Sequence, residues 1–178
     1  MISKSLAFLL LLFLSPLFAI ITVSILLFDG RPVFFIQKRV GVDSSYFNIY
    51  KFRTMKLKTP NVATRLLENS EHYISKTGSF LRKFGLDELP NLYNIIRGEM
   101  GFVGPRPVLF NEYDLLKLRK NFGIDKMLPG LTGLAQINGR NDLPPELKIK
   151  YEIEYLKNNS LQFDIKIILR TIIHSSFR

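Results

Sequence analysis

Hydrophobic and polar positions divide this chain into one long apolar run followed by shorter amphipathic segments. The run extends from Leu6 to Phe28 without a charged residue, and as a straight helix it would reach roughly 35 Å, enough to cross a bilayer. A secretory signal peptide has a shorter apolar region that ends at a small-residue cleavage site, and neither property fits here. Ser15-Pro16 lies at the middle of the run. Because Pro16 lacks a backbone donor, the sequence predicts a kink there.

Basic residues flank both ends of the apolar run. Lys4 precedes it, and a larger group follows it, namely Arg31, Lys38, Arg39, Lys51 and Arg53. The positive-inside tendency places the downstream side in the cytoplasm and gives the N-terminus no strong reason to lie elsewhere. A re-entrant helix, which bends at Ser15-Pro16 and leaves on the face it entered, satisfies both observations. A simple kinked span is the alternative. In either case residues 1–29 form an anchor and residues 30–178 form one further domain.

After the anchor, residues 31–56 have the pattern of a small β-hairpin unit. β-Branched and aromatic residues gather in Pro32–Gln37 and in Tyr46–Phe52, and turn residues occupy Gly41–Ser45. A helix is expected around Ala63–Glu71. Four later segments have apolar residues at helical spacing, namely Asp87–Arg97 (stopped by Gly98), Phe110–Phe122, Pro145–Asn158 and Leu161–Ile173. Gly, Pro and Asn mark loops at Pro129–Gly133 and Asn138–Asn141. The last helix suits either a membrane surface or the core.

The amino-acid composition limits the binding partners and catalytic groups that are possible for this chain. The net charge of +10 favours an anionic partner such as a phosphorylated substrate, an acidic lipid or nucleic acid. The chain has no cysteine, which excludes disulfides and thiolate chemistry, and its two histidines, His72 and His174, are isolated. Carboxylates therefore remain as the main candidates for catalysis. Aromatic-basic RNA-binding motifs are missing, so no nucleic-acid partner is expected.

Asp87-Glu88 is the most informative pair of carboxylates. In one interpretation the pair only begins a helix, with Asp87 as a cap and Glu88 favouring the helix dipole. In the other, one carboxylate attacks a phosphorus atom while the other helps to hold a cation that cancels the repulsion from the phosphates. Mg²⁺ is the natural choice for that cation.

Arginine and lysine side chains near this pair suggest phosphate binding. Pro105-Arg106-Pro107 is a rigid turn that could aim a guanidinium fork at phosphate oxygens, or simply be solvated. The basic cluster Lys51-Phe-Arg-Thr-Met55 offers Lys51 and Arg53 as contacts to phosphate or nucleotide. Gln37-Lys-Arg39 is a second basic cluster, and taken alone either cluster is most often a solvated face.

These motifs, in this order, resemble the monotopic phosphoglycosyl transferases of bacteria. The resemblance runs from Ser15-Pro16 to the C-terminal helix, through Leu86-Asp-Glu-Leu-Pro90, Gly104–Pro107 and Pro129–Gln136. It implies that Asp87 is the nucleophile and that Glu88, with Asp87, forms the magnesium site. It also implies that the phosphate or nucleotide is bound by Arg106 with Pro105 and Pro107, and by Lys51, Arg53, Arg82 and Arg140.

The resemblance implies a fold, a reaction and a location as well. The fold class is α/β, mainly α, with a re-entrant membrane helix broken at Ser15-Pro16, a small β-hairpin and amphipathic helices at the membrane interface. The expected reaction transfers a phospho-sugar from a UDP-sugar to polyprenyl (undecaprenyl) phosphate with Mg²⁺ and releases UMP. The expected location is the bacterial inner membrane, with the catalytic domain facing the cytoplasm and in contact with membrane lipids.

Some features depart from the family pattern or stay open. Glu99-Met-Gly101 stands where Asp-Met-Ser is commoner, and Glu152 stands where Asp is usual. These differences affect the expected fine geometry of the metal or acceptor site. The chain resembles the minimal catalytic form, without the extra membrane helices of larger members. A non-enzymatic basic protein that binds anionic lipid or RNA is the alternative. The sequence does not indicate the sugar, the lipid length, the glycan pathway or the oligomeric state.

Overall fold

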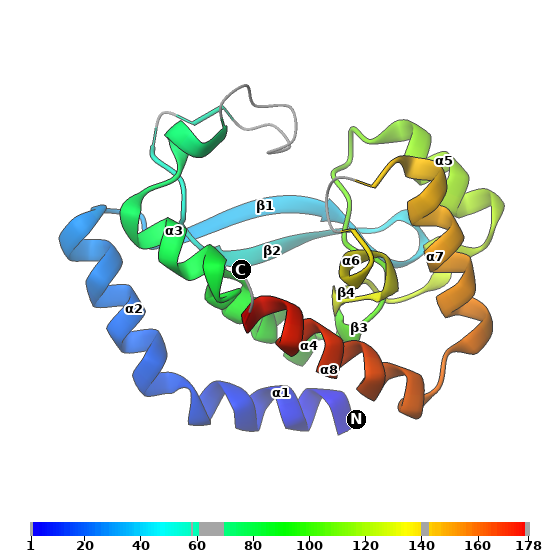
Figure 1. Cartoon of the computed structure of the whole chain (residues 1–178), viewed down its shortest axis with the longest axis horizontal. Coiled ribbons are helices and arrows are strands. Elements are labelled where there is room, and N and C mark those ends of the chain that lie inside the picture. The colour runs from blue at the N-terminus through cyan, green and yellow to red at the C-terminus, as the bar shows by residue number, and fades with distance from the viewer. Residues whose placement is uncertain (1, 58, 61–69, 140–142, 177–178) are drawn as a thin grey trace.

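The computed structural model describes residues 2–57, 59–60, 70–139 and 143–176 (Figure 1). Helices dominate, and two short sheets complete the fold, in agreement with the predicted class. Short 3₁₀ helices, labelled η, connect several elements. The elements in chain order are α1 (Ile2–Phe13), α2 (Ser15–Phe28), β1 (Phe34–Val40), η1 (Val42–Ser44), β2 (Tyr46–Phe52), η3 (Ser70–Tyr73), α3 (Lys76–Lys83), η4 (Leu86–Asn91), α4 (Leu92–Arg97), β3 (Gly101–Val103), α5 (Tyr113–Asn121), η5 (Ile124–Lys126), β4 (Gly130–Thr132), α6 (Leu134–Ile137), α7 (Pro145–Asn158) and α8 (Leu161–Ser176).

The N-terminal apolar run is broken where the sequence predicts. The helix axis bends by 59° between α1 and α2. Pro16 has no N–H for the carbonyl of Leu12, and the Ser15 hydroxyl donates to that carbonyl instead, at 2.7 Å. Within the described part of the chain, no single helix is long and apolar enough to cross a membrane. Together, α1 and α2 have the length and composition that a membrane-inserted bent pair needs. The re-entrant arrangement stays a prediction.

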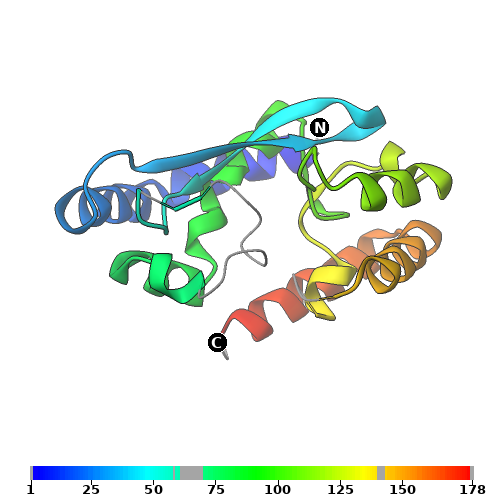
Figure 2. The same cartoon turned by 90° about the horizontal axis from the view of Figure 1, so that it is seen from above.

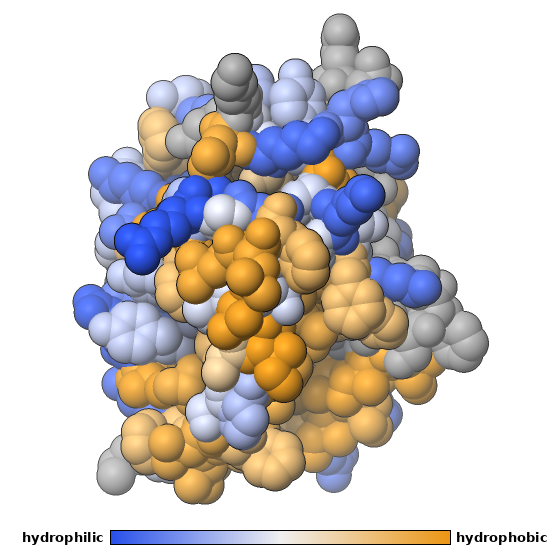
Figure 3. Space-filling model, turned by 90° about the vertical axis from the view of Figure 1, so that its left-hand side faces the viewer, coloured by the Kyte–Doolittle hydropathy of each residue, from blue (hydrophilic) through white to orange (hydrophobic). Residues whose placement is uncertain are grey.

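Helix α2 presents an apolar surface to the outside. Figure 3 shows hydrophobic residues covering the end of the molecule where α2 lies, with hydrophilic residues above them. The large apolar residues that α2 exposes are Ile20, Val23, Leu26, Leu27 and Phe28. An exposed apolar surface of this kind is typical of regions that contact another protein or a membrane.

The β1–β2 hairpin extends along one side of the molecule, from the α2–α3 end to the α5–α7 end (Figure 2). The strands are antiparallel, with Phe34 opposite Phe52 and Val40 opposite Tyr46. Strand β2 has the predicted bounds. Strand β1 begins at Phe34 rather than Pro32 and continues to Val40, where the amide donates to the Val108 carbonyl at 3.0 Å. This bond ties the hairpin to the segment that follows the Pro-Arg-Pro turn.

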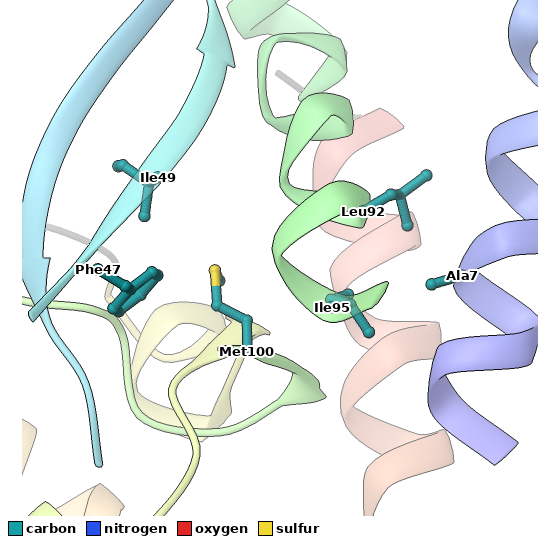
Figure 4. Close-up of a cluster of buried hydrophobic side chains, with 6 residues drawn as sticks. All are labelled: Ala7, Phe47, Ile49, Leu92, Ile95 and Met100. Atoms are coloured by element: carbon teal, nitrogen blue, oxygen red, sulfur yellow. The ribbon is translucent and has the colours of Figure 1, made fainter. Parts of the chain in front are cut away.

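The hydrophobic core includes both halves of the bent helix pair. Figure 4 shows Ala7 of α1 against α4, with β2 on the other side of the cluster. This cluster consists of Ala7, Phe47, Ile49, Leu92, Ile95 and Met100. Ile21 and Ile25 of α2 pack with Phe52 and Leu81 in a second cluster. Leu86 and Leu89, which flank Asp87-Glu88 in the chain, also pack against this second cluster, so the anchor contacts the segment that carries the two carboxylates.

A small parallel sheet in the second half of the chain was not predicted. Residues 130–132, expected within a loop, form β4, which pairs with β3. The two backbones approach so closely that a Cβ on Gly130 would lie 2.1 Å from the Gly104 nitrogen, so glycine is required there. Helix α7 has the predicted bounds, α8 extends three residues further, and α5 begins at Tyr113 rather than Phe110.

Between residues 57 and 86 the structure tests only part of the prediction. Most of the helix expected at Ala63–Glu71 lies outside the described residues, and its last two positions, Ser70 and Glu71, belong to the 3₁₀ helix η3. Helix α3 was not expected. Ser75 caps it, because its hydroxyl accepts a hydrogen bond from the Gly78 amide at 2.9 Å.

Candidate active site

Asp87 and Glu88 lie in a 3₁₀ helix. The single helix expected from Asp87 to Arg97 is divided into η4 and α4, because Pro90 cannot donate to a preceding carbonyl. The residue that precedes η4 is Gly85, whose φ of 67° is left-handed, and its position makes the N-cap interpretation of Asp87 wrong. Helix α4 ends at Gly98 as predicted. The two carboxylates are thus held by a tight turn rather than used to begin an α-helix.

Glu88 lies between two of the predicted basic residues. Its Oε1 atom is 2.5 Å from the Lys51 ammonium and 3.9 Å from the Arg106 guanidinium. Lys51 reaches Glu88 because it shares a face of β2 with Phe47 and Ile49, which pack toward α4. The structure therefore brings together Lys51, Glu88 and Arg106 from three separate parts of the chain.

Asp87 lies in a partly buried position that changes its acidity. Burial, and then the negative charge of Glu88, raise the pKa of its carboxyl group, while Lys51 and Arg82 oppose this rise. A carboxylate with a raised pKa is more basic when it is ionised, and so a better nucleophile. The local cations keep the ionised form accessible.

Arg82 is the third predicted basic residue at this site. It comes from α3, and its Nε donates to the Thr54 hydroxyl at 2.8 Å. Burial lowers its pKa, and the negative charges of Asp87 and Glu88 raise it. This dependence shows that the guanidinium lies within electrostatic reach of both carboxylates.

The Pro105-Arg106-Pro107 turn is fixed at its carbonyls. Both prolines are buried, whereas the Arg106 side chain is about one-third exposed, at 34%. The Gly130 amide donates to the Pro105 carbonyl at 2.9 Å, and Arg39 donates to the Pro107 carbonyl at 3.2 Å. The turn therefore holds its arginine near Glu88 while leaving the guanidinium partly open to solvent.

Arg39 is a residue of this site that sequence reasoning did not select. Burial and the nearby Arg106 lower its pKa to about 10, against the raising effect of Glu112 and Glu88. Its Nη2 donates to Gln37 at 2.6 Å, and its buried Nε has no hydrogen-bond partner among the described residues. The two-residue spacing of Gln37 and Arg39 on a strand was the available signal, because it places both side chains on one face.

Other predicted site residues lie elsewhere. The buried guanidinium of Arg53 donates to the carbonyls of Asp29, Gly30 and Arg31, at 2.6 to 2.8 Å. The structure thus places Arg53 at the exit of the anchor, and not with Lys51 and Glu88. Arg140 lies outside the described residues. Ser15 and Pro16 form the helix break.

The positions that depart from the family pattern have structural partners. Glu99 accepts hydrogen bonds from Asn94 and Arg97, at 2.7 and 2.8 Å. Gly101 begins β3. Glu152 is buried and forms an ion pair with Arg119. None of these contacts involves Asp87 or Glu88.

The carboxylates suit a shared rather than a self-sufficient metal site. Among the described residues, no three His, Cys, Asp or Glu side chains gather at a possible metal site. Mg²⁺ is commonly held by one or two carboxylates together with substrate phosphates and water. Asp87 and Glu88 fit that requirement, provided that phosphate oxygens complete the coordination.

The Asp87-Glu88 pair has the properties needed for phosphoryl transfer, because Lys51 and Arg106 lie beside Glu88, and Lys51 and Arg82 act on Asp87. Comparison with known proteins decides between this and a non-catalytic phosphate or lipid site. The family model described as bacterial sugar transferase matches residues 1–178.

The chain belongs to the bacterial sugar transferase family. This confirms the resemblance, and the chain is an enzyme of the sugar phosphotransferase class rather than the non-enzymatic alternative.

Several curated relatives of this sugar transferase carry informative names. It is 40% identical to the exopolysaccharide production protein ExoY of Rhizobium meliloti, over 91% of this chain and 78% of that protein. It is 38% identical to the UDP-glucose:undecaprenyl-phosphate glucose-1-phosphate transferase of Escherichia coli, over 94% of this chain but only 38% of the relative. It is 35% identical to the undecaprenyl-phosphate galactose phosphotransferase of Salmonella typhimurium, over 80% and 33% of the two chains.

Proposed function

We propose that this sugar transferase moves a phospho-sugar from a UDP-sugar to undecaprenyl phosphate and releases UMP. The observation that carries the proposal is Asp87, a partly buried carboxylate with a raised pKa, beside Glu88 and within reach of Lys51 and Arg82. The Escherichia coli and Salmonella relatives are named for transfer to undecaprenyl phosphate, which supports this acceptor.

In the first step, an Asp87 carboxylate oxygen attacks the sugar-bearing phosphorus of the donor. The bond from that phosphorus to the bridging oxygen breaks, and UMP leaves with the electron pair. A phospho-sugar remains bound to Asp87 as an acyl phosphate. We assign the binding of the phosphate oxygens to Arg106, and its partly exposed guanidinium and its fixed backbone support this assignment.

In the second step, a phosphate oxygen of undecaprenyl phosphate attacks the same phosphorus. The bond to Asp87 breaks, the carboxylate is restored, and the product is an undecaprenyl diphosphate-sugar. Lys51 and Arg82 stabilise the restored carboxylate, because both lower the pKa of Asp87.

We also propose Mg²⁺ as a cofactor that Asp87 and Glu88 would hold together with substrate phosphates. When bound it would neutralise part of the diphosphate charge. Lys51 is 2.5 Å from Glu88, so this lysine must share or release the carboxylate oxygen when the ion is present. The location proposed is the cytoplasmic face of the inner membrane, with the bent α1–α2 pair as a re-entrant anchor. The exposed apolar surface of α2 supports that location.

The decisive experiment measures UMP release by the protein in nanodiscs with Mg²⁺, undecaprenyl phosphate and a panel of UDP-sugars. The test variant is Asp87→Asn, which has nearly the same size, and the control is Asp114→Asn, which removes an exposed carboxylate from α5. Release should need the lipid for turnover, survive in the control and disappear in Asp87→Asn. Near-normal turnover by folded Asp87→Asn would overturn the role of Asp87. Folded wild-type protein that releases no UMP from any donor would overturn the reaction.

A further inference from the structure

A buried ion pair behind the Pro-Arg-Pro turn connects α5 and α7 to the proposed active site. Arg119 of α5 and Glu152 of α7 are 8% and 3% exposed at their side chains. The Arg119 Nε donates to one oxygen of Glu152 at 2.8 Å, and its Nη2 donates to the other. Such a two-bond fork fixes the plane of the guanidinium.

The same guanidinium also holds the backbone of the turn. The Arg119 Nη2 donates to the carbonyl of Arg106 at 2.9 Å. This atom therefore bonds Glu152 and Arg106 at once, and the orientation that Glu152 imposes directs an N–H group at the turn. The carbonyls on either side accept from Gly130 and Arg39, so each of the three carbonyls of Pro105-Arg106-Pro107 has its own donor.

The turn needs such external donors. Two of its three residues are prolines, which have no N–H, so it cannot be held by a hydrogen-bond ladder of its own. The prolines limit its internal shape but not its position relative to Glu88. Hydrogen bonds from other elements must set that position, and the bond from Arg119 is the one made directly at Arg106.

The stability of the fold alone does not explain why Arg119 and Glu152 form a buried ion pair. Removing two charges from water is costly, and well-packed apolar residues in place of a buried ion pair are often neutral or stabilising. The pair lies beside an apolar cluster that includes Leu115 of α5 and Ile149 of α7, which already joins these helices. An effect on the turn explains the pair better.

We propose that Arg119 and Glu152 are positioning residues that hold Arg106 in place for the transfer reaction. The proposal rests on the proposed function for its kinetic consequence, but its structural consequence can be measured independently. Neither residue is expected to contact the substrate.

The test removes both charges at once and keeps the volume. The variant Arg119→Met/Glu152→Leu should keep a melting temperature close to wild type and lose roughly ten- to a hundredfold in kcat/KM for UMP release. Glu152→Asp, which keeps the charge and shortens the side chain by one methylene, should retain more activity than the double variant. Arg97→Lys, which alters an exposed ion pair to Glu99, is the control and should change nothing measurable.

A mutant cycle shows whether the pair acts through Arg106. Arg106→Lys is combined with Arg119→Met/Glu152→Leu. If the pair acts through Arg106, the combined variant is no less active than Arg106→Lys alone. If the two losses multiply in folded protein, the positioning role is wrong. Should the double apolar variant fail to fold, Arg119→Lys takes its place in the cycle.

Hydrogen exchange supplies the readout that does not need activity. Loss of the Arg119 bond should speed amide exchange in the peptide covering Arg106 to Leu109 and leave the β2 peptide unchanged. Unchanged exchange in the turn would overturn the proposal, whether or not the wild-type protein releases UMP. A wild-type protein without UMP release, but with faster exchange in the variant, would overturn the proposed function and support the positioning contact.

Discussion

Lys51 Nζ lies 2.5 Å from Glu88 Oε1, in a contact that joins strand β2 to the turn carrying both proposed catalytic carboxylates. The two side chains are partly buried, at 16% and 28% exposed, so solvent screens this pair less than a surface ion pair. The lysine therefore neutralises the carboxylate beside Asp87 before a substrate arrives. It is also the cation that a donor diphosphate would meet next to Asp87.

Replacing Lys51 with methionine should lower kcat/KM for UMP release by about a hundredfold or more, because one cation aimed at the phosphates is lost. Lys51→Arg should lose less, since it keeps the charge with a different shape. Lys38→Met is the matched control, because Lys38 is an exposed lysine of the neighbouring strand that stacks on Tyr46. Equal losses in Lys51→Met and Lys38→Met would mean that only net charge matters.

A second prediction concerns the close contact between α3 and the segment after β2. A Cβ on Gly78 would lie 2.1 Å from the backbone oxygen of Thr54, so α3 must shift in Gly78→Ala. We expect a loss of about 1–3 kcal/mol in stability and lower activity, because Arg82 bonds the Thr54 hydroxyl one turn later. Thermal unfolding in detergent measures the loss of stability, and UMP release measures the loss of activity.

Ser79→Ala is the control for this prediction. Ser79 is the exposed neighbour of Gly78 on α3, and its replacement should change stability by no more than about 0.5 kcal/mol. A melting temperature for Gly78→Ala that matches the control would show that the helix and the Thr54 backbone can separate without cost.

The third prediction is that Arg53 stabilises the segment that follows the anchor and does not bind the substrate. Its buried guanidinium donates to three carbonyls between Asp29 and Arg31. Lysine cannot reproduce this fork, so Arg53→Lys should lower stability by roughly 2–4 kcal/mol. The KM for the UDP-sugar should stay near wild type in the folded fraction.

The opposite result for Arg53→Lys would be an unchanged melting temperature and a KM for the UDP-sugar raised tenfold. That result would support the hypothesis from the sequence that Arg53 contacts the nucleotide. Arg31→Lys provides the comparison, because the Arg31 side chain is exposed and only its carbonyl takes part in the cluster.

Local signals were enough to predict several elements. Strand β2 has turn residues before it and alternates Phe47 and Ile49 toward the core, and α7 begins at Pro145, a favoured first helical residue. The break at Pro16 follows from the missing N–H alone. Strands β3 and β4 gave no such signal, because each has three residues and forms only where glycines let two distant backbones meet.

The site shows the same limit. Asp87, Glu88, Lys51 and Arg106 were selected, and the structure brings them together. Sequence could not separate Arg53 from Arg39, because both belong to basic clusters near strands. The positions of the two side chains depend on strand register. Arg39 lies opposite Phe47 and so faces the site, whereas Arg53 follows the last residue of β2 and turns toward the anchor.

The last prediction concerns membrane topology and uses the absence of cysteine from the chain. Ile2→Cys places a thiol at the exposed start of α1, and Ser79→Cys places one on the exposed face of α3. If the bent pair is re-entrant, a membrane-impermeant maleimide should label neither in intact spheroplasts and both after permeabilisation. A spanning pair would put the two thiols on opposite sides, so Ile2→Cys would be labelled in intact spheroplasts while Ser79→Cys stayed protected. The 59° bend and the packing of both α1 and α2 on the core favour the first result, because a straight span would pull one of these helices off the fold.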